Sequence, residues 1–107
     1  MEHDMMVLES RLEFALPAGE KQRLNCIVTK DGTLEAILDV HGLKCVQVRK
    51  IINNMLNLAR QRLCLAVIHG FNHGTAIKDM LPSMDNPHIV STACDANNPG
   101  KTYIMIA

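Results

Sequence analysis

The stretch "AVIHGFNHGTAIKDML", residues 66–81, predicts the fold class of this chain of 107 residues. It begins inside a wholly apolar run from Leu63 to Ile68, which is typical of a buried parallel strand. His69 and Gly70 end that run, and a polar loop with a second histidine and a second glycine follows. A helical pattern then starts near Thr75. A strand that turns through glycines into a helix is the repeating unit of α/β proteins.

The same order of elements occurs once before in the chain. A strand is expected from Leu34 to Val40, and it also ends at a His-Gly pair, residues 41–42. A helix is expected from Lys44 to Gln61, because apolar residues recur there at intervals of three and four and would form one face of a helix. These apolar residues are Val48, Ile51, Ile52, Met55, Leu56 and Ala59.

The remaining segments supply further strands and one more helix. Asp31-Gly32 is a strong hairpin signal, and it joins the strand at 34–40 to an earlier strand. Further along we expect, in order, a helix (Thr75–Met84), a strand (His88–Cys94), a loop (95–101) and a last strand (Thr102–Ile106). Pro82 is expected to shorten the helix, because proline lacks the N–H that a helix interior needs.

These elements predict an α/β (α+β) two-layer sandwich of the order βαβαββ. About four strands would form a mixed sheet, and two helices would cover one of its faces. This domain is expected over residues 36–107. Residues 1–35 are expected to be an N-terminal extension that could include a hairpin strand. Within it, residues 1–20 fit the spacing of a helix and that of a strand equally well.

The charges are unevenly spread along the chain. The formal net charge is zero, yet no Asp or Glu occurs from Val40 to Lys78. That stretch holds several cations: Lys44, Arg49, Lys50, Arg60, Arg62 and Lys78. A basic middle between acidic ends favours a polyanionic partner, although a solvated helix surface would show the same pattern.

Composition and cysteine spacing indicate a cytoplasmic protein without a membrane partner. The longest apolar run is too short to cross a bilayer, and the N-terminus lacks the pattern of a secretory signal. Four cysteines lie far apart and form no CxxC pair, which favours buried free thiols in a reducing compartment over a zinc site.

Polar residues gather at the predicted carboxyl ends of two neighbouring strands. Asp39 and His41 are two residues apart and therefore point to the same face, while His69 ends the next strand. Ligands of open α/β sheets bind at such an edge, and a helix N-terminus after a glycine turn favours an anion. Histidines there could move protons at neutral pH. The structural alternative is that Asp39 forms a turn and each histidine is a satisfied packing residue.

Two motifs carry a resemblance to a known family. "ILDVHGL" at 37–43 resembles the LDLHG motif that opens Smr domains, the small MutS-related family. "VIHGFNHGTAIK" at 67–78 resembles their second motif, roughly HGxGxGxLR, and the closing "GKTYIMIA" resembles their glycine-rich turn and last strand. The resemblance covers about residues 36–107.

The resemblance implies a fold similar to the C-terminal domain of translation initiation factor three, nucleic-acid binding, and cleavage of RNA or nicking of DNA. It ties Asp39 and His41 to cleavage and matches His69, Gly70, Gly74 and Lys78 to the second motif. Ile77 replaces the leucine of that motif. Asn72 replaces its middle glycine, and the loop is one residue longer.

The leading hypothesis is therefore an endonuclease. His41 would act as general base or acid, Asp39 would orient it or hold a metal, and His69 would be the partner acid. RNA could use its own 2′-hydroxyl, whereas DNA would need activated water and favours a divalent metal such as magnesium. The phosphate contacts would come from Gly42, Lys44, Lys50, Arg60, Gly70, Asn72, His73, Gly74, Thr75 and Lys78.

Two alternatives stay open at this point. The chain could be a nucleic-acid-binding module without catalysis, which the altered loop and the zero net charge favour. It could also bind a small phosphorylated ligand at the two helix N-termini.

Overall fold

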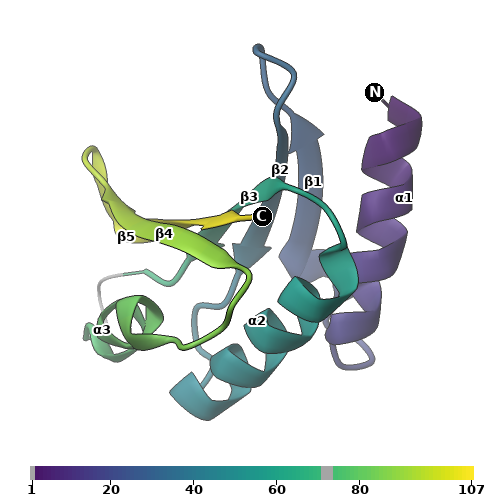
Figure 1. Ribbon diagram of the computed structural model, residues 1–107. Helices are drawn as coiled ribbons and strands as arrows, with labels where there is room; N and C mark the ends of the chain where they lie inside the picture. Colours follow the sequence, from purple (N-terminus) through teal and green to yellow (C-terminus); the bar gives the residue numbers. More distant parts are fainter. Residues whose placement is uncertain (1, 71–73) are drawn as a thin grey trace.

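One mixed five-stranded sheet with α-helices on one face forms the protein in the computed structural model, which describes residues 2–70 and 74–107 (Figure 1). The elements are α1 (Glu2–Leu12), β1 (Leu24–Val28), β2 (Leu34–Asp39), α2 (Cys45–Ala59), β3 (Leu63–Ile68), α3 (Ala76–Met80), β4 (Ile89–Asp95) and β5 (Asn98–Ile106). Short 3-10 helices cover Glu13–Ala15, Lys21–Arg23 and Leu81–Ser83. The predicted class, α+β with a mixed sheet, is confirmed.

The strand order is β1-β2-β3-β5-β4. β2 and β3 are parallel, with Asp39 opposite Ile68, and the other neighbours are antiparallel. Because β2 and β3 run the same way, their carboxyl ends meet at one edge of the sheet. The turns that lead into α2 and toward α3 leave from that edge (Figure 1).

Alternation along the strands places the core between the sheet and the helices. Ala36, Leu38 and Val40 are fully buried, and so is Val67 of β3. The predicted apolar stripe of α2 is confirmed, because all six of its residues are buried: Val48, Ile51, Ile52, Met55, Leu56 and Ala59. At about 25 cal/mol per Å² of apolar surface, such burial is the main stabilising term of the fold.

The N-terminal segment belongs to the same core. The expectation was about four strands and two helices, whereas the described residues form five strands and three α-helices. The fifth strand is β1, which pairs with β2 through the Asp31-Gly32 hairpin. The third helix is α1, whose Leu8 and Leu12 are buried in one cluster with α2 and the sheet. The predicted extension and the remainder of the chain therefore share one hydrophobic core.

Two predicted segments differ from the structure at their ends. The second predicted helix, 75–84, is shortened at Pro82 as expected: it is α-helical only over α3 and continues as the 3-10 turn Leu81–Ser83, where Pro82 cannot donate to the helix ladder. The predicted loop 95–101 is a tight turn, because the Asp95 carboxylate accepts the Asn97 N–H at 2.8 Å and β5 already begins at Asn98.

Within the described part of the chain, the longest helix is α2 with 15 residues. A membrane-spanning helix needs about 20 mostly apolar residues. None of the described helices is therefore long and apolar enough to cross a membrane.

Candidate functional site

A groove of about 640 Å³ lies where β2 and β3 end and α2 and α3 begin. It brings together many of the predicted site residues, namely His41, Gly42, Lys44, His69, Gly70, Gly74 and Lys78. Leu43, Cys45, Ala76 and Ile77 complete its lining. The predicted meeting of the two His-Gly turns at one edge of the sheet is confirmed.

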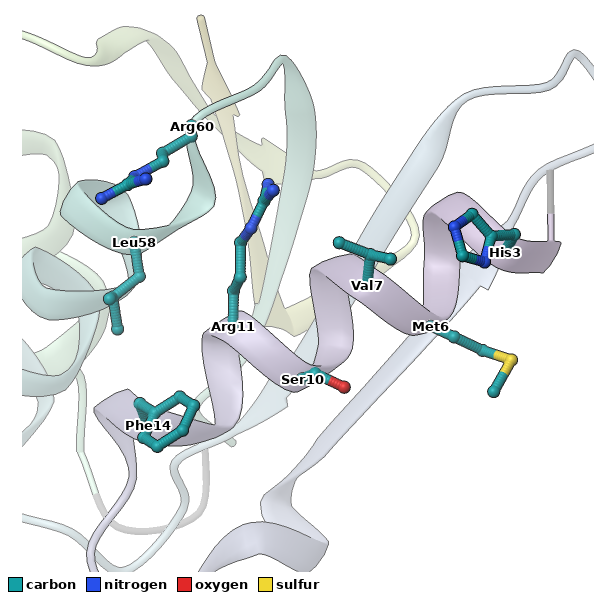
Figure 2. Close-up of a pocket in the computed structure, with 8 residues that line it drawn as sticks. All are labelled: His3, Met6, Val7, Ser10, Arg11, Phe14, Leu58 and Arg60. Atoms are coloured by element: carbon teal, nitrogen blue, oxygen red, sulfur yellow. The ribbon is translucent and has the colours of Figure 1, made fainter.

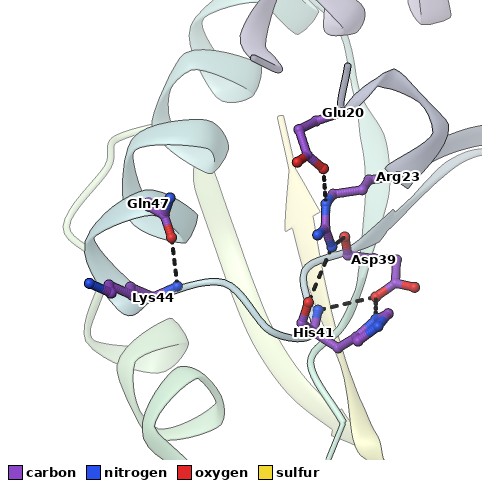
Figure 3. A network of polar contacts seen from close by, with 6 residues as sticks. All are labelled: Glu20, Arg23, Asp39, His41, Lys44 and Gln47. Carbon is purple, nitrogen blue, oxygen red and sulfur yellow. Dashed lines mark hydrogen bonds and ion pairs between the residues drawn. The ribbon is translucent and has the colours of Figure 1, made fainter. Parts of the chain in front are cut away.

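Asp39 and His41 are in direct contact at this edge. Asp39 Oδ1 accepts the backbone N–H of His41 at 3.1 Å and lies 2.5 Å from ring atom Nδ1 of the same residue (Figure 3). An ionised carboxylate only accepts hydrogen bonds, so Nδ1 carries the proton. In the neutral ring, the other nitrogen, Nε2, then has a free lone pair. The histidine side chain is 69% exposed, so this lone pair is accessible to a ligand.

His69 is held very differently. Its Nδ1 lies 2.9 Å from the carbonyl oxygen of Gly70 and its Nε2 lies 2.8 Å from Oγ1 of Thr102. The carbonyl can only accept, so Nδ1–H donates to it, and in the neutral ring Nε2 then accepts from the hydroxyl. His69 is 9% exposed and Thr102 is fully buried. To transfer a proton, His69 would first have to give up one of these two bonds.

The glycines of the two turns have backbone conformations that side chains disfavour. Gly42 and Gly70 have φ values of +81° and +75°, in the left-handed region. The backbone N–H groups of His69 and Gly70 both donate to Gly100 of β5, at 2.9 and 3.1 Å. These amides are thus used by the fold. The amides of the first turn of α2, which have no partner inside the helix, remain the better anion donors.

The N-terminus of α2 is shaped by its own sequence. Gln47 Oε1 accepts the backbone N–H of Lys44 at 2.9 Å, which satisfies the amide just before the first helical residue (Figure 3). The Lys44 side chain is exposed and lines the groove together with Lys78. The groove therefore combines two cations with the positive end of a helix dipole, an arrangement suited to a phosphate.

Other predicted phosphate contacts lie elsewhere. Lys50 lines a separate hollow beside Pro17. Arg60 follows the end of α2, one helix length from Lys44, and lines a groove with Arg11 and Phe14 of the N-terminal segment (Figure 2). The basic stretch of the sequence therefore does not form one surface.

Three further predicted phosphate contacts, Asn72, His73 and Thr75, precede α3 in the sequence. The hydroxyl of Thr75 donates to Asp79 at 2.8 Å, and Thr75 does not line the groove. Asn72 and His73 lie outside the described residues. The roles predicted for these two residues stay predictions.

Arg23 is one of two residues at this site that the sequence analysis did not predict. It comes from the 3-10 turn before β1, and its Nη1 donates to the carbonyl oxygens of Asp39 and His41 at 3.1 and 3.2 Å (Figure 3). Its Nε contacts the carboxylate of Glu20. Contacts across 16 and 18 positions leave no local signal in the sequence. Thr102 was missed for the same reason.

Metal ligation has little support in the described residues, which contain no cluster of three or more His, Cys, Asp or Glu side chains suited to a metal ion.

Comparisons of the chain with protein-family models, with curated proteins and with solved structures found no match. The geometry of the groove therefore carries the functional argument.

Proposed function

We propose that the protein binds nucleic acid in the groove at the ends of β2 and β3 and cleaves a phosphodiester there through His41. The observation that carries the proposal is the 2.5 Å contact between Asp39 Oδ1 and His41 Nδ1 beside a groove lined by Lys44 and Lys78. An exposed imidazole that is oriented by a carboxylate, next to two cations, is suited to proton transfer on a bound phosphate.

On RNA, the 2′-hydroxyl would attack the adjacent phosphorus while Nε2 of His41 takes its proton. Asp39 stabilises the imidazolium that forms, because its carboxylate faces the protonated Nδ1. Lys44 and Lys78 offset the negative charge that grows on the phosphoryl oxygens, and the bond to the 5′-oxygen breaks. DNA lacks the 2′-hydroxyl, so its hydrolysis would require an activated water and favours a divalent metal such as magnesium at Asp39.

The second proton transfer, to the leaving 5′-oxygen, was assigned to His69. Both ring nitrogens of His69 are engaged, by Gly70 and by Thr102. This observation favours a second candidate function, a nucleic-acid-binding module without catalysis. If cleavage occurs, His69 must break its bond to Thr102, or His41 must return the proton it has taken.

Membership of the Smr family and a cytoplasmic location are part of the same proposal. The family membership rests on the motifs at 37–43 and 67–78, and on the βαβαββ order of the part of the chain from β2 onward. The location rests on the four cysteines, which are free thiols; Cys26 and Cys64 are buried as expected, whereas Cys45 is half-buried and Cys94 is exposed.

The test is incubation of the pure protein with end-labelled RNA and DNA, each with magnesium and with EDTA, followed by mapping of the cut ends. We expect RNA cleavage in EDTA that leaves 2′,3′-cyclic phosphate ends. His41→Ala should slow it by about 10²–10⁴-fold, the usual contribution of one acid–base group.

His88→Ala is the matched control, because His88 is also exposed but lies before β4 and does not line the groove. Its cleavage rate should equal that of the wild type. Equal loss of activity in both variants, or cleavage that persists in His41→Ala, would remove the catalytic assignment. Binding without any cleavage would leave the second candidate.

A further inference from the structure

The edge of the sheet beside the candidate site is incomplete. β1 pairs with β2 only as far as Leu24 opposite Leu38. In this register the residue just before β1, Arg23, would pair with Asp39, but its backbone belongs to the 3-10 helix Lys21–Arg23. Among the described residues, no strand therefore lies beside the carbonyl groups of Asp39 and His41 on that side.

The side chain of Arg23 takes the place of the missing strand. Its Nη1 donates to both carbonyl oxygens, at 3.1 Å to Asp39 and 3.2 Å to His41 (Figure 3). These two contacts, which we call the carbonyl clamp, hold the backbone on both sides of Val40. The carboxylate of Glu20 contacts Nε of the same guanidinium and fixes its orientation.

The carbonyl clamp holds the backbone that sets the geometry of the Asp39–His41 pair. Asp39 Oδ1 must accept from both the backbone N–H and the ring Nδ1 of His41, so the two residues must keep their relative backbone orientation. The Arg23 side chain is only 20% exposed and its charge is offset by Glu20, which makes it a poor phosphate contact and a good support. We propose that Arg23, held by Glu20, is a positioning residue that fixes the Asp39–His41 pair for proton transfer.

Through Arg23 and Glu20, the N-terminal segment would take part in positioning the site residues. Its consequence for cleavage rests on the proposed function, whereas the effect of the clamp on the His41 ring does not. The two can therefore be tested separately. A displacement of about 1 Å in a reacting group can cost on the order of 10²-fold in rate.

The experiment compares the wild type with Arg23→Gln, Arg23→Lys and Glu20→Gln. The first readout is the tautomer of the neutral His41 ring, measured by ¹H–¹⁵N NMR. We expect the Nδ1–H form to dominate in the wild type and to fall below about half in Arg23→Gln, while Arg23→Lys, which can still donate to one carbonyl, restores part of it. Glu20→Gln should give an intermediate loss.

The second readout is cleavage. kcat should fall by roughly 10–100-fold in Arg23→Gln with KM unchanged, since the groove lysines are untouched. Arg62→Gln is the control, because Arg62 is exposed and lies at the opposite end of β3, and it should change neither readout.

A wild-type tautomer in folded Arg23→Gln would overturn the inference. If Arg23→Gln does not fold, a wild-type tautomer in both Arg23→Lys and Glu20→Gln would overturn it equally. A tautomer shift in a protein that cleaves nothing would support the clamp and refute the cleavage part of the proposed function.

Discussion

Replacement of Thr102 by valine should show whether the hydrogen bond between Thr102 and His69 stabilises the fold. Valine has nearly the shape of threonine but lacks the hydroxyl that lies 2.8 Å from Nε2 of His69. The ring nitrogen would then be left without a partner in a place where His69 is 9% exposed and Thr102 is fully buried. Water cannot easily replace the lost bond there.

The expected loss follows from that burial. Leaving a buried polar group without its partner costs about 1–3 kcal/mol of unfolding free energy. For a domain of this size, the melting temperature should fall by roughly 5–15 °C. Urea denaturation followed by circular dichroism would give the free energy, and a thermal melt would give the temperature. His69→Ala should lose at least as much, because it also opens a cavity.

Thr92→Val is the matched control, since Thr92 lies half-buried on the neighbouring strand β4 and no hydrogen bond of its hydroxyl is found among the described residues. His41→Ala should change the free energy by less than about 0.5 kcal/mol, as is usual for exposed positions. The reasoning would be refuted if Thr102→Val were as stable as Thr92→Val. It would also be refuted if His41→Ala destabilised the protein as much as His69→Ala.

Three further predictions concern the groove, a buried thiol and the N-terminal helix. Lys44→Ala and Lys78→Ala should each reduce the slope of log K against log salt by about 0.7 for a single strand, whereas Lys50→Ala and Arg60→Ala, outside the groove, should leave it unchanged in a binding titration. Burial, with Glu9 and Glu13 nearby, raises the pKa of the Cys26 thiol from 9.0 to about 12, so the unfolded chain loses this proton at a lower pH than the folded one. Stability should therefore fall as pH rises from about 9 toward 12, and the fall should be smaller in Cys26→Ala by urea denaturation at each pH. Leu8→Ala should cost about 2–5 kcal/mol because Leu8 is fully buried, whereas Phe14→Ser, at a position 84% exposed, should be nearly neutral in the same assay.

Local patterns predicted the features that depend on neighbours in the sequence. The apolar stripe of α2 follows from helical spacing, the Asp31-Gly32 hairpin from turn chemistry, and the shared face of Asp39 and His41 from strand alternation. Each of these needs only a few adjacent residues to be specified. The sequence was therefore sufficient to predict most of the sheet and the placement of Asp39 and His41 on one face.

Features that depend on tertiary contacts could not be predicted in this way. The helical state of α1 is selected by the burial of Leu8 and Leu12 against α2 and the sheet, which outweighs an ambiguous local pattern. The hydroxyl beside His69 comes from Thr102, 33 positions later. Arg23 reaches the site because β1 begins at Leu24, one residue too late to pair with Asp39, and leaves Arg23 outside the strand.

The two His-Gly turns show how position in the sheet decides the role of a histidine. β3 lies between β2 and β5, and β5 continues past the end of β3, so that Gly100 accepts the backbone N–H groups of His69 and Gly70. The Thr102 hydroxyl contacts the His69 ring, and His69 is buried. β2 instead has β1 as its outer neighbour, and β1 stops before β2 ends. His41 consequently projects beyond the last strand pair and stays 69% exposed. The register adds to this difference: Asp39 is opposite Ile68, so the fully buried Val40 lies opposite His69, and His41 lies one residue farther along and points to the other face.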